Sequence, residues 1–172
     1  VTDIRYWWYQ SNGKLYAPQG GRHLAPRQHA RLQNPKRASF DQVFRAVREY
    51  RTAYPDKAVL YSADDSYGWA VLMGGGSIPN IRNLTDQALL AAIPRMRPYD
   101  TPADANGQYA LAEPGRAYFV YAESGEKVRL DLSDAKGMLA VRWIDPKSGN
   151  VSSDGDTIAA GVSVELKLKF RP

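Results

Sequence analysis

Several features that narrow down the function of a protein are scarce in this sequence. Its 172 residues contain no cysteine and only two histidines, His23 and His29. The lack of cysteine excludes a disulfide framework, and two histidines six positions apart do not have the spacing of a metal site on a helix or strand. No apolar run approaches the roughly 18 residues of a membrane span. The sequence therefore predicts no metal site and no membrane partner.

Acidic residues are absent between Asp3 and Asp41, where seven Lys and Arg residues lie. Residues 1–104 carry 14 Lys and Arg against 9 Asp and Glu, whereas residues 105–172 carry 9 of each. The basic residues are scattered through a Gly- and Pro-containing loop rather than along one helix face, and no nucleic-acid-binding motif surrounds them. We therefore expect no nucleic-acid partner; an acidic neighbour beside the loop explains the charge.

Aromatic side chains, in contrast, are plentiful, with 11 Tyr and 4 Trp. Residues 5–31 are the richest stretch: Trp7, Trp8 and Tyr9 end an apolar strand and are followed by a long loop of Gly, Pro, Arg, Gln and His. Indole rings stack on the apolar C–H faces of pyranoses, and planar polar groups bond their hydroxyls. This combination indicates a sugar-binding site.

The first half of the sequence alternates between strands and helices. The predicted elements are strand Asp3–Tyr9, helix Ser39–Tyr54, strand Ala58–Ser62, helix Tyr67–Met73 and helix Asp86–Ile93. Ser39 and Gln42 form a capping box for the first helix, and Thr85 is the expected cap of the last. Strand, helix and strand in this order predict a parallel βαβ unit, which must be covered on both faces. Residues 1–100 supply too few strands for this, so we expect a second chain or further sequence to complete the sheet.

The second half changes to an apolar period of two. Its predicted strands are Arg116–Ala122, Lys127–Leu132, Met138–Ile144 and Val162–Phe170. Turn signals separate them, most clearly Ser124-Gly125 and the segment from Asp145 to Gly149. Short alternating strands with frequent turns predict a small antiparallel β-sandwich over residues 105–172.

Two segments carry a resemblance to a known group of enzymes. Residues 118–150, YFVYAESGEKVRLDLSDAKGMLAVRWIDPKSGN, combine an aromatic strand, a Ser-Gly turn, a V-x-L-D-L strand and a W-x-D-P-x-x-G turn, and residues 67–81, YGWAVLMGGGSIPNI, combine a short helix with a glycine run. Both resemble the C-terminal end of (β/α)₈-barrel glycoside hydrolases that carry an appended β-sandwich of the type named after collagen binding. The resemblance implies the last two βα units of a (β/α)₈ (TIM) barrel over residues 1–100, with strands seven and eight at Asp3–Tyr9 and Ala58–Ser62.

The same resemblance implies a function. Such enzymes hydrolyse glycosidic bonds of polysaccharides or oligosaccharides outside the cell or in the periplasm, with two carboxylates and no cofactor. They usually place a Glu after the seventh strand, but this chain has Gln10 there and no Glu before Glu49. We therefore expect at least one catalytic acid outside this sequence, or an absent activity, and a role for this chain in substrate contacts. The alternative is a non-catalytic carbohydrate- or protein-binding β-sandwich module docked on a partner.

Candidate substrate-binding residues follow the seventh strand, because barrel active sites lie at the C-terminal ends of strands. Tyr9 is a further candidate. Side chains alternate along a strand, so only one of Trp7 and Trp8 can face the barrel interior. Either that tryptophan stacks on a sugar ring, or both tryptophans pack in the core. In the loop that follows, Arg27, Gln28 and His29 either bond sugar hydroxyls or a uronate, or hold the loop in place with Arg27 paired to a barrel carboxylate.

The candidates after the eighth strand are Asp64 and Asp65, the only adjacent acids in the chain. One of them binds substrate, or acts as an acid or base if burial raises its pKa. The alternative is that Asp65 or Ser66 caps the helix beginning at Tyr67. Trp69 either lines the same pocket or packs in the core. The glycine run at 74–76 follows a helix and lacks the Lys of a phosphate loop, so it is interpreted as a helix stop.

Overall fold

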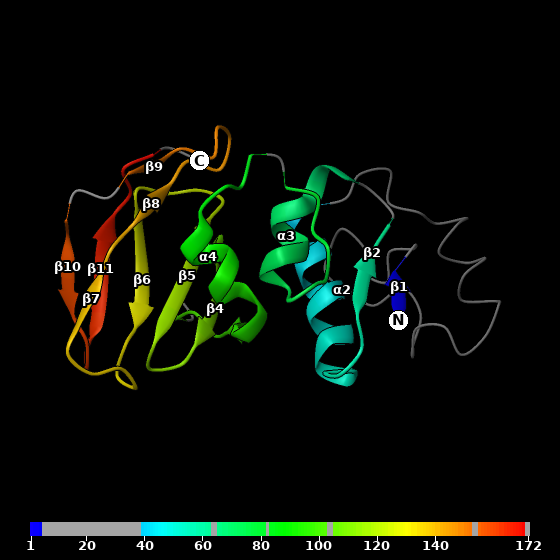
Figure 1. Cartoon of the computed structure of the whole chain (residues 1–172), viewed down its shortest axis with the longest axis horizontal. Coiled ribbons are helices and arrows are strands. Elements are labelled where there is room, and N and C mark those ends of the chain that lie inside the picture. Colours follow the sequence, from blue (N-terminus) through cyan, green and yellow to red (C-terminus); the bar gives the residue numbers. More distant parts are fainter. Residues whose placement is uncertain (5–38, 63–64, 82, 103–104, 153–154, 171–172) are drawn as a thin grey trace. The chain divides into compact units, whose positions relative to one another are not determined.

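The computed structural model describes residues 1–4, 39–62, 65–81, 83–102, 105–152 and 155–170. The chain forms two units, Val1–Asn80 and Ile81–Pro172, which are drawn in sequence colours in Figure 1. The division lies earlier than the predicted domains, 1–100 and 105–172, because residues 81–100 belong to the second unit. The fold is mixed, as predicted: α-helices accompany many antiparallel strands, and the described sheets have two or three strands and do not close into a barrel.

The first unit contains the predicted parallel pair of strands. Strand β1 (Thr2–Ile4) lies beside β2 (Val59–Tyr61), with Thr2 opposite Val59 and Ile4 opposite Tyr61. Helix α2 (Phe40–Ala53) lies between them in sequence, so the predicted order of strand, helix and strand is confirmed. Ile4 on β1 and Val59 on β2 are buried, so both strands contribute side chains to the core.

Helix α2 begins and ends close to the predicted positions. The Ser39 hydroxyl accepts a hydrogen bond from the Gln42 backbone N–H at 3.2 Å, which caps the first turn. The apolar stripe is buried, with Val43 and Val47 fully inaccessible. The helix ends just before Pro55, whose ring and missing N–H prevent another turn.

Helix α3 (Gly68–Met73) is preceded by the 3₁₀ turn η1 (Asp65–Tyr67). This turn places the N-cap at Tyr67, which makes no side-chain cap hydrogen bond. The N-cap of α3 therefore differs from the alternative in which Asp65 or Ser66 occupies that position, because the 3₁₀ turn includes both residues.

The glycine run has a packing role as well as the predicted role of a helix stop. Helix α3 ends at Met73, and Gly74 is its C-cap. A Cβ atom on Gly74 would lie 2.8 Å from the Cβ of Val47, inside the contact distance of two carbons. The absence of side chains therefore allows the end of α3 to approach α2.

The second unit contains one short helix, a 3₁₀ turn and nine strands among its described residues. They are α4 (Gln87–Ala92), η2 (Ile93–Arg95), β3 (Arg97–Tyr99), β4 (Gln108–Glu113), β5 (Ala117–Ala122), β6 (Lys127–Asp131), β7 (Met138–Ala140), β8 (Trp143–Ile144), β9 (Val151–Ser152), β10 (Thr157–Ala159) and β11 (Ser163–Lys167). They pair antiparallel in the orders β3-β4-β5, β6-β11, β7-β10 and β8-β9. The antiparallel character predicted for this half is confirmed.

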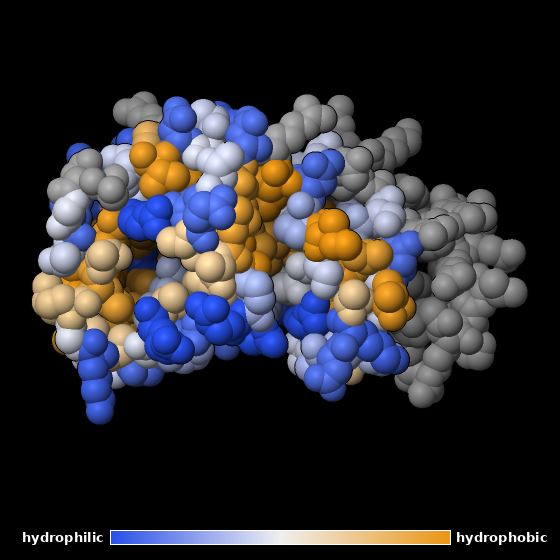
Figure 2. Space-filling model, in the orientation of Figure 1, coloured by the Kyte–Doolittle hydropathy of each residue, from blue (hydrophilic) through white to orange (hydrophobic). Residues whose placement is uncertain are grey.

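Among the described residues, three of the four small sheets of the second unit share one core, and the β8–β9 pair does not contribute to it. It is centred on Leu130, Leu132 and Ala135. Side chains of β3, β5, β7, β10 and β11 pack against it, namely Tyr99, Tyr118, Val120, Leu139, Ile158 and Val164. Burial is incomplete elsewhere, and orange hydrophobic residues remain visible between hydrophilic ones in Figure 2; Met138 and Val162 are 63% and 55% exposed.

Three details of the second half differ from the prediction. The expected strand Met138–Ile144 is divided into β7 and β8, and the sequence does not predict β3, β4, β9 or β10. The cap of α4 is Asp86 rather than Thr85, because the Asp86 carboxylate accepts from the Leu89 N–H at 2.7 Å. Asp86 is buried and also forms an ion pair with Arg142, beside β8.

The turn from Asp145 to Gly149 forms as predicted and closes the β8–β9 hairpin. The Asp145 carboxylate accepts from the Lys147 N–H at 2.9 Å and from the Ser148 hydroxyl at 2.6 Å. Gly149 has a φ of +77°, and a Cβ there would overlap the carbonyl oxygen of Asn83. The hairpin tip therefore packs against the segment that leads into α4.

Candidate functional site

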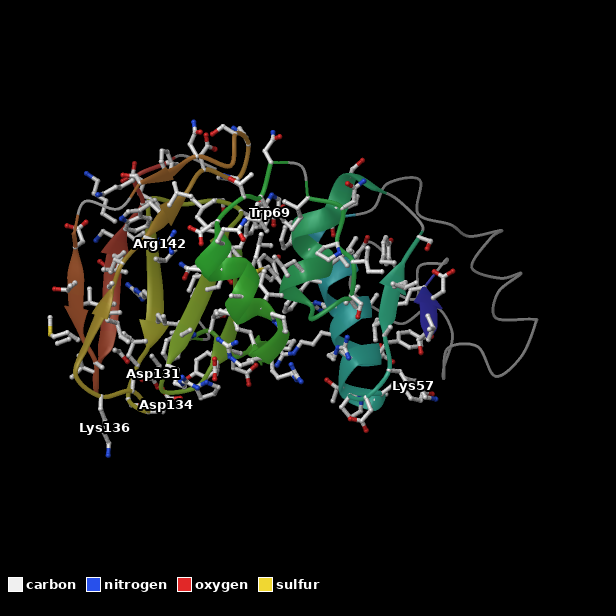
Figure 3. All side chains as sticks on the ribbon, viewed as in Figure 1. Lys57, Trp69, Asp131, Asp134, Lys136 and Arg142 are labelled. Carbon is white, nitrogen blue, oxygen red and sulfur yellow. The ribbon has the colours of Figure 1, made fainter. Side chains whose placement is uncertain are left out.

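Most of the predicted site residues lie outside the described part of the structure. These are Trp7, Trp8, Tyr9, Arg27, Gln28, His29 and Asp64. Asp65 begins η1, but its side chain is also outside the description. Trp69 is described: it is half-buried on α3, where the other five residues are buried (Figure 3).

The backbone nevertheless brings together the two strand ends from which these candidates follow. Ile4 and Tyr61 are opposite each other at the carboxyl ends of parallel strands β1 and β2. The Ser62 N–H bonds to the Ile4 carbonyl at 3.0 Å, which extends the pairing by one residue. The segment that contains Trp7 and Trp8 and the segment that contains Asp64 and Asp65 therefore start from the same edge of one sheet.

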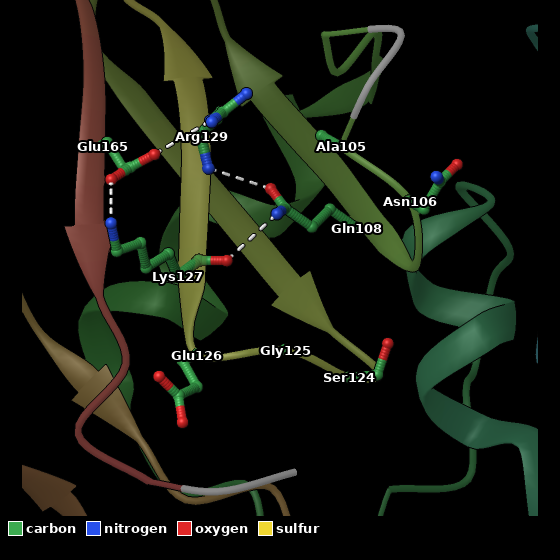
Figure 4. A pocket seen from close by; sticks show the side chains of 9 residues that line it. All are labelled: Ala105, Asn106, Gln108, Ser124, Gly125, Glu126, Lys127, Arg129 and Glu165. Atoms are coloured by element: carbon green, nitrogen blue, oxygen red, sulfur yellow. Dashed lines mark hydrogen bonds and ion pairs between the residues drawn. The ribbon is translucent and has the colours of Figure 1, made fainter.

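A separate feature, a polar hollow on the second unit, had not been predicted. Its volume is about 460 Å³. We call it the β6 hollow; it is lined by Ala105, Asn106, Gln108, Ser124, Gly125, Glu126, Lys127, Arg129 and Glu165 (Figure 4). The lining comes from three parts of the sequence: the turn before β4 with the first residue of β4, the β5–β6 turn with β6, and β11.

Hydrogen bonds from one side chain form a wall of the β6 hollow. The Gln108 amide nitrogen donates to the Lys127 carbonyl at 3.1 Å, and its oxygen accepts from the Arg129 N–H at 2.9 Å (Figure 4). Successive residues of a strand direct their backbone N–H and C=O groups to opposite edges of the strand. The Leu132 N–H bonds to the Val162 carbonyl, directly before β11, so every second residue of β6 counted from Leu132 faces β11. Lys127 and Arg129 therefore present their backbone to the opposite edge of β6, where Gln108 takes the place of a neighbouring strand.

A carboxylate and two cations form the adjacent wall. Glu165 on β11 accepts from Lys127 Nζ at 2.6 Å and from Arg129 Nε at 2.9 Å. The hydrogen bonds from Lys127 and then Arg129 hold the pKa of Glu165 below its usual value. Strand register accounts for this contact, because Glu165 is directly opposite Arg129.

A second polar cluster surrounds Tyr118 on β5 and the loop after β6. The Tyr118 hydroxyl donates to the Asp134 carboxylate and accepts from the Gly115 N–H at 2.8 Å. Burial, together with the hydrogen bond to Asp134, raises the pKa of Tyr118 to about 12. The Tyr99 ring meets the Tyr118 ring edge to face, with centroids 5.7 Å apart. These bonds fix a loop, and Asp131 and Asp134 mark it in Figure 3.

Within the described residues, no group of three or more His, Cys, Asp and Glu residues is placed to hold a metal ion. No helix in the described ranges has the length and hydrophobicity needed to cross a membrane. His23 and His29 lie outside those ranges.

Comparison with known families identifies one match, which covers the first unit and the beginning of the second. Residues 1–96 match a domain of unknown function, DUF6298. The chain belongs to this family. The DUF6298 match spans the βαβ unit, α3, α4 and η2, and it ends at Met96, directly before β3. No curated protein matches the chain, and no solved structure does.

Proposed function

We propose that this chain is part of a secreted or periplasmic glycoside hydrolase that acts on a polysaccharide or oligosaccharide without a cofactor. In this proposal, residues 1–100 form the last two βα units of a (β/α)₈ barrel, and residues 105–172 form a β-sandwich appended to it. The observation that carries the proposal is the parallel pairing of β1 and β2, with α2 between them and α3 after them.

A parallel pair is not a complete structure. Parallel sheets are covered on both faces and have more neighbours than two strands provide. Units of strand and helix that recur in this order build (β/α)₈ barrels, and further strands from a second chain or from additional barrel sequence would complete this one. Glycan substrate and that completing sequence are therefore the partners we propose.

The candidate residues follow β1 and β2 in sequence, and a barrel active site lies at the carboxyl ends of the strands. The residues after β1 include Trp7 and Trp8, one of which stacks on a sugar ring in this proposal. Arg27, Gln28 and His29 follow in the same loop and bond hydroxyls, and Tyr9 and Trp69 line the pocket. Asp64 and Asp65 follow β2 and contact the substrate from the neighbouring strand.

At least one carboxylate of the catalytic pair is assigned to other strands of the completed barrel. Glycosidases need two carboxylates, about 5–5.5 Å apart for retention or about 6.5–9.5 Å apart for inversion. The first Glu of this chain is Glu49, which lies on helix α2 and not in the segment that follows β1. Asp64 and Asp65 are adjacent, so one strand end cannot present both on opposite faces of a sugar.

Release of reducing sugar by the complete protein that contains this chain tests the proposal. The substrates are xylan, arabinan, pectin and mixed-linkage glucan. We expect hydrolysis of at least one, and a decrease in kcat/KM of about 10-fold or more in either Trp7→Ala or Trp8→Ala, because a lost stacking contact weakens transition-state binding.

Tyr54→Ala is the matched control, since Tyr54 is an exposed aromatic residue at the far end of α2. Its kcat/KM should equal that of the unmodified protein. Absence of hydrolysis of every substrate, or an equal loss in the tryptophan and tyrosine variants, would overturn the assignment.

A further inference from the structure

We propose that the β6 hollow binds a neutral, hydroxyl-rich ligand, a sugar unit of a glycan, through the hydroxyls at the edge of its ring. The proposal extends glycan recognition to the second unit and rests on residues other than those of the proposed barrel site. Its basis is the composition, charge and hydrogen bonding of the hollow in Figure 4.

The charges that line the hollow balance. Lys127 and Arg129 contribute two positive charges, and Glu126 and Glu165 contribute two negative charges. Because neither sign is in excess, the lining favours neither an anion nor a cation over a neutral ligand. Hydroxyl groups both donate and accept, so they can bond to carboxylates and cations side by side.

The polar groups are also held in place before any ligand arrives. Gln108 is fixed at both ends of its amide by the β6 backbone, and Glu165 is fixed by two cations. Side chains that are already ordered lose less conformational entropy when a ligand binds. A volume of about 460 Å³ lies within the range of small-molecule sites.

Affinity should nevertheless be weak. None of the residues in the described lining is aromatic, so the hollow provides no surface for stacking on a pyranose face. The ligand must then bind by hydrogen bonds in competition with water, each of which contributes little net free energy. We expect a dissociation constant on the order of 1 mM for a single oligosaccharide chain.

Nuclear magnetic resonance titration of the chain tests this proposal directly. The probes are xylotetraose, cellotetraose and mannotetraose as neutral ligands, and tetragalacturonate and inorganic phosphate as anions. At least one neutral ligand should shift the Gln108 side-chain amide and the Arg129 Nε–H signals with a saturable, millimolar response. The two anions should leave those signals unchanged.

The chain contains a matched control for the key carboxylate. Glu113 accepts from Arg95 at 2.8 Å and from Arg116 at 3.0 Å, and it lies outside the hollow. The hydrogen bond from Arg95 lowers the pKa of Glu113, as the bond from Lys127 lowers that of Glu165. Glu165→Gln should weaken binding about fivefold or more, whereas Glu113→Gln should leave it unchanged.

Asn106→Ala provides a second variant that removes a lining amide, and it should weaken binding about twofold. Saturable shifts with an anion alone, equal effects of Glu165→Gln and Glu113→Gln, or no shift up to 50 mM neutral ligand would each overturn the proposal. Since these measurements use binding at named residues of the second unit, their failure is distinct from a failure of the hydrolysis assay.

Discussion

The two units complete their backbone hydrogen bonds in different ways. In the first unit, a single cation links several chain segments: Arg51 on α2 donates to the carbonyls of Gly75, Pro55 and Lys57, at 2.7, 3.0 and 2.8 Å. In the second unit, the strands are short, and neutral side chains cover the outer edge of β6. Gln108 bonds to two of its residues, and the Tyr99 hydroxyl donates to the Asp131 carbonyl at 3.4 Å.

The difference shows that the size and type of a sheet determine which side chains bond to its unpaired backbone groups. Helices and a parallel pair of strands leave backbone carbonyls without a partner at loops and helix ends. The guanidinium group of one Arg side chain can donate hydrogen bonds to several of them. Short antiparallel sheets leave strand edges, which planar amides and hydroxyls can pair with. The second arrangement places polar side chains in a row along an edge, and the β6 hollow is a consequence.

The largest effect should come from a hairpin contact of the second unit. Gly149→Ala combines a positive φ with an overlap of the new methyl group and the Asn83 carbonyl, so we expect about 3 kcal/mol or more of destabilisation. Gly155→Ala shares the positive φ but has no atom within 4 Å of the new methyl, and should cost about 1 kcal/mol. Urea unfolding measures both; equal losses would mean that the hairpin tip does not pack on Asn83.

A smaller effect should come from the cation of the first unit. Arg51→Leu removes donors from three carbonyls and from the Ser77 hydroxyl, and should lower the free energy of unfolding of that unit by about 2 kcal/mol. Arg45→Leu removes only an exposed pair with Asp41 and should cost less than about 0.5 kcal/mol. If the two variants unfold alike in urea, Arg51 does not hold the first unit together.

The smallest effect is a pH dependence confined to the second unit. The pKa of Tyr118 is raised to about 12 from an ordinary value of 10.0. The contribution of its protonated hydroxyl to the free energy of unfolding is therefore fully present below pH 10 and is lost as the pH rises through about 12. Stability should fall over this interval, and less steeply in Tyr118→Phe. Tyr54→Phe, on the first unit, serves as the comparison, and circular dichroism during urea unfolding provides the measurement. Identical slopes in all three proteins would contradict the role of Tyr118.

Periodicity predicted the elements that have a single buried face. Helix α2 shows a clear apolar stripe, β6 alternates between buried and exposed residues, and β11 alternates between half-buried and exposed residues, so all three could be located from sequence. Strand β4 is buried along Tyr109–Ala112, so its sequence does not alternate between apolar and polar residues. Strand β3 contains Pro98, and proline in a sequence argues against a strand. The caps of α3 and α4 depended on one extra 3₁₀ turn and on the Asp86–Arg142 pair, which local sequence does not reveal.

The candidate sites differ in the same respect. Residues that follow β1 and β2 could be proposed from sequence because parallel strands end at one edge. The β6 hollow could not be proposed from sequence, because Gln108 and Glu165 come from strands far apart in the chain. Glu165 reaches the hollow because the register of β11 places it opposite Arg129 on β6. Two carboxylates between paired cations, Glu113 and Glu165, are indistinguishable in sequence, yet only Glu165 lines the hollow.

The proline in β3 bears on how concentrated solutions of the chain should behave. Strand β3 is one of the two edge strands of its sheet among the described residues, and Pro98 removes one N–H from it. A strand that lacks a donor is a poor template for intermolecular pairing, so this edge resists growth of the sheet into aggregates. The residue that conceals the strand from sequence analysis thus also helps to keep neighbouring molecules apart.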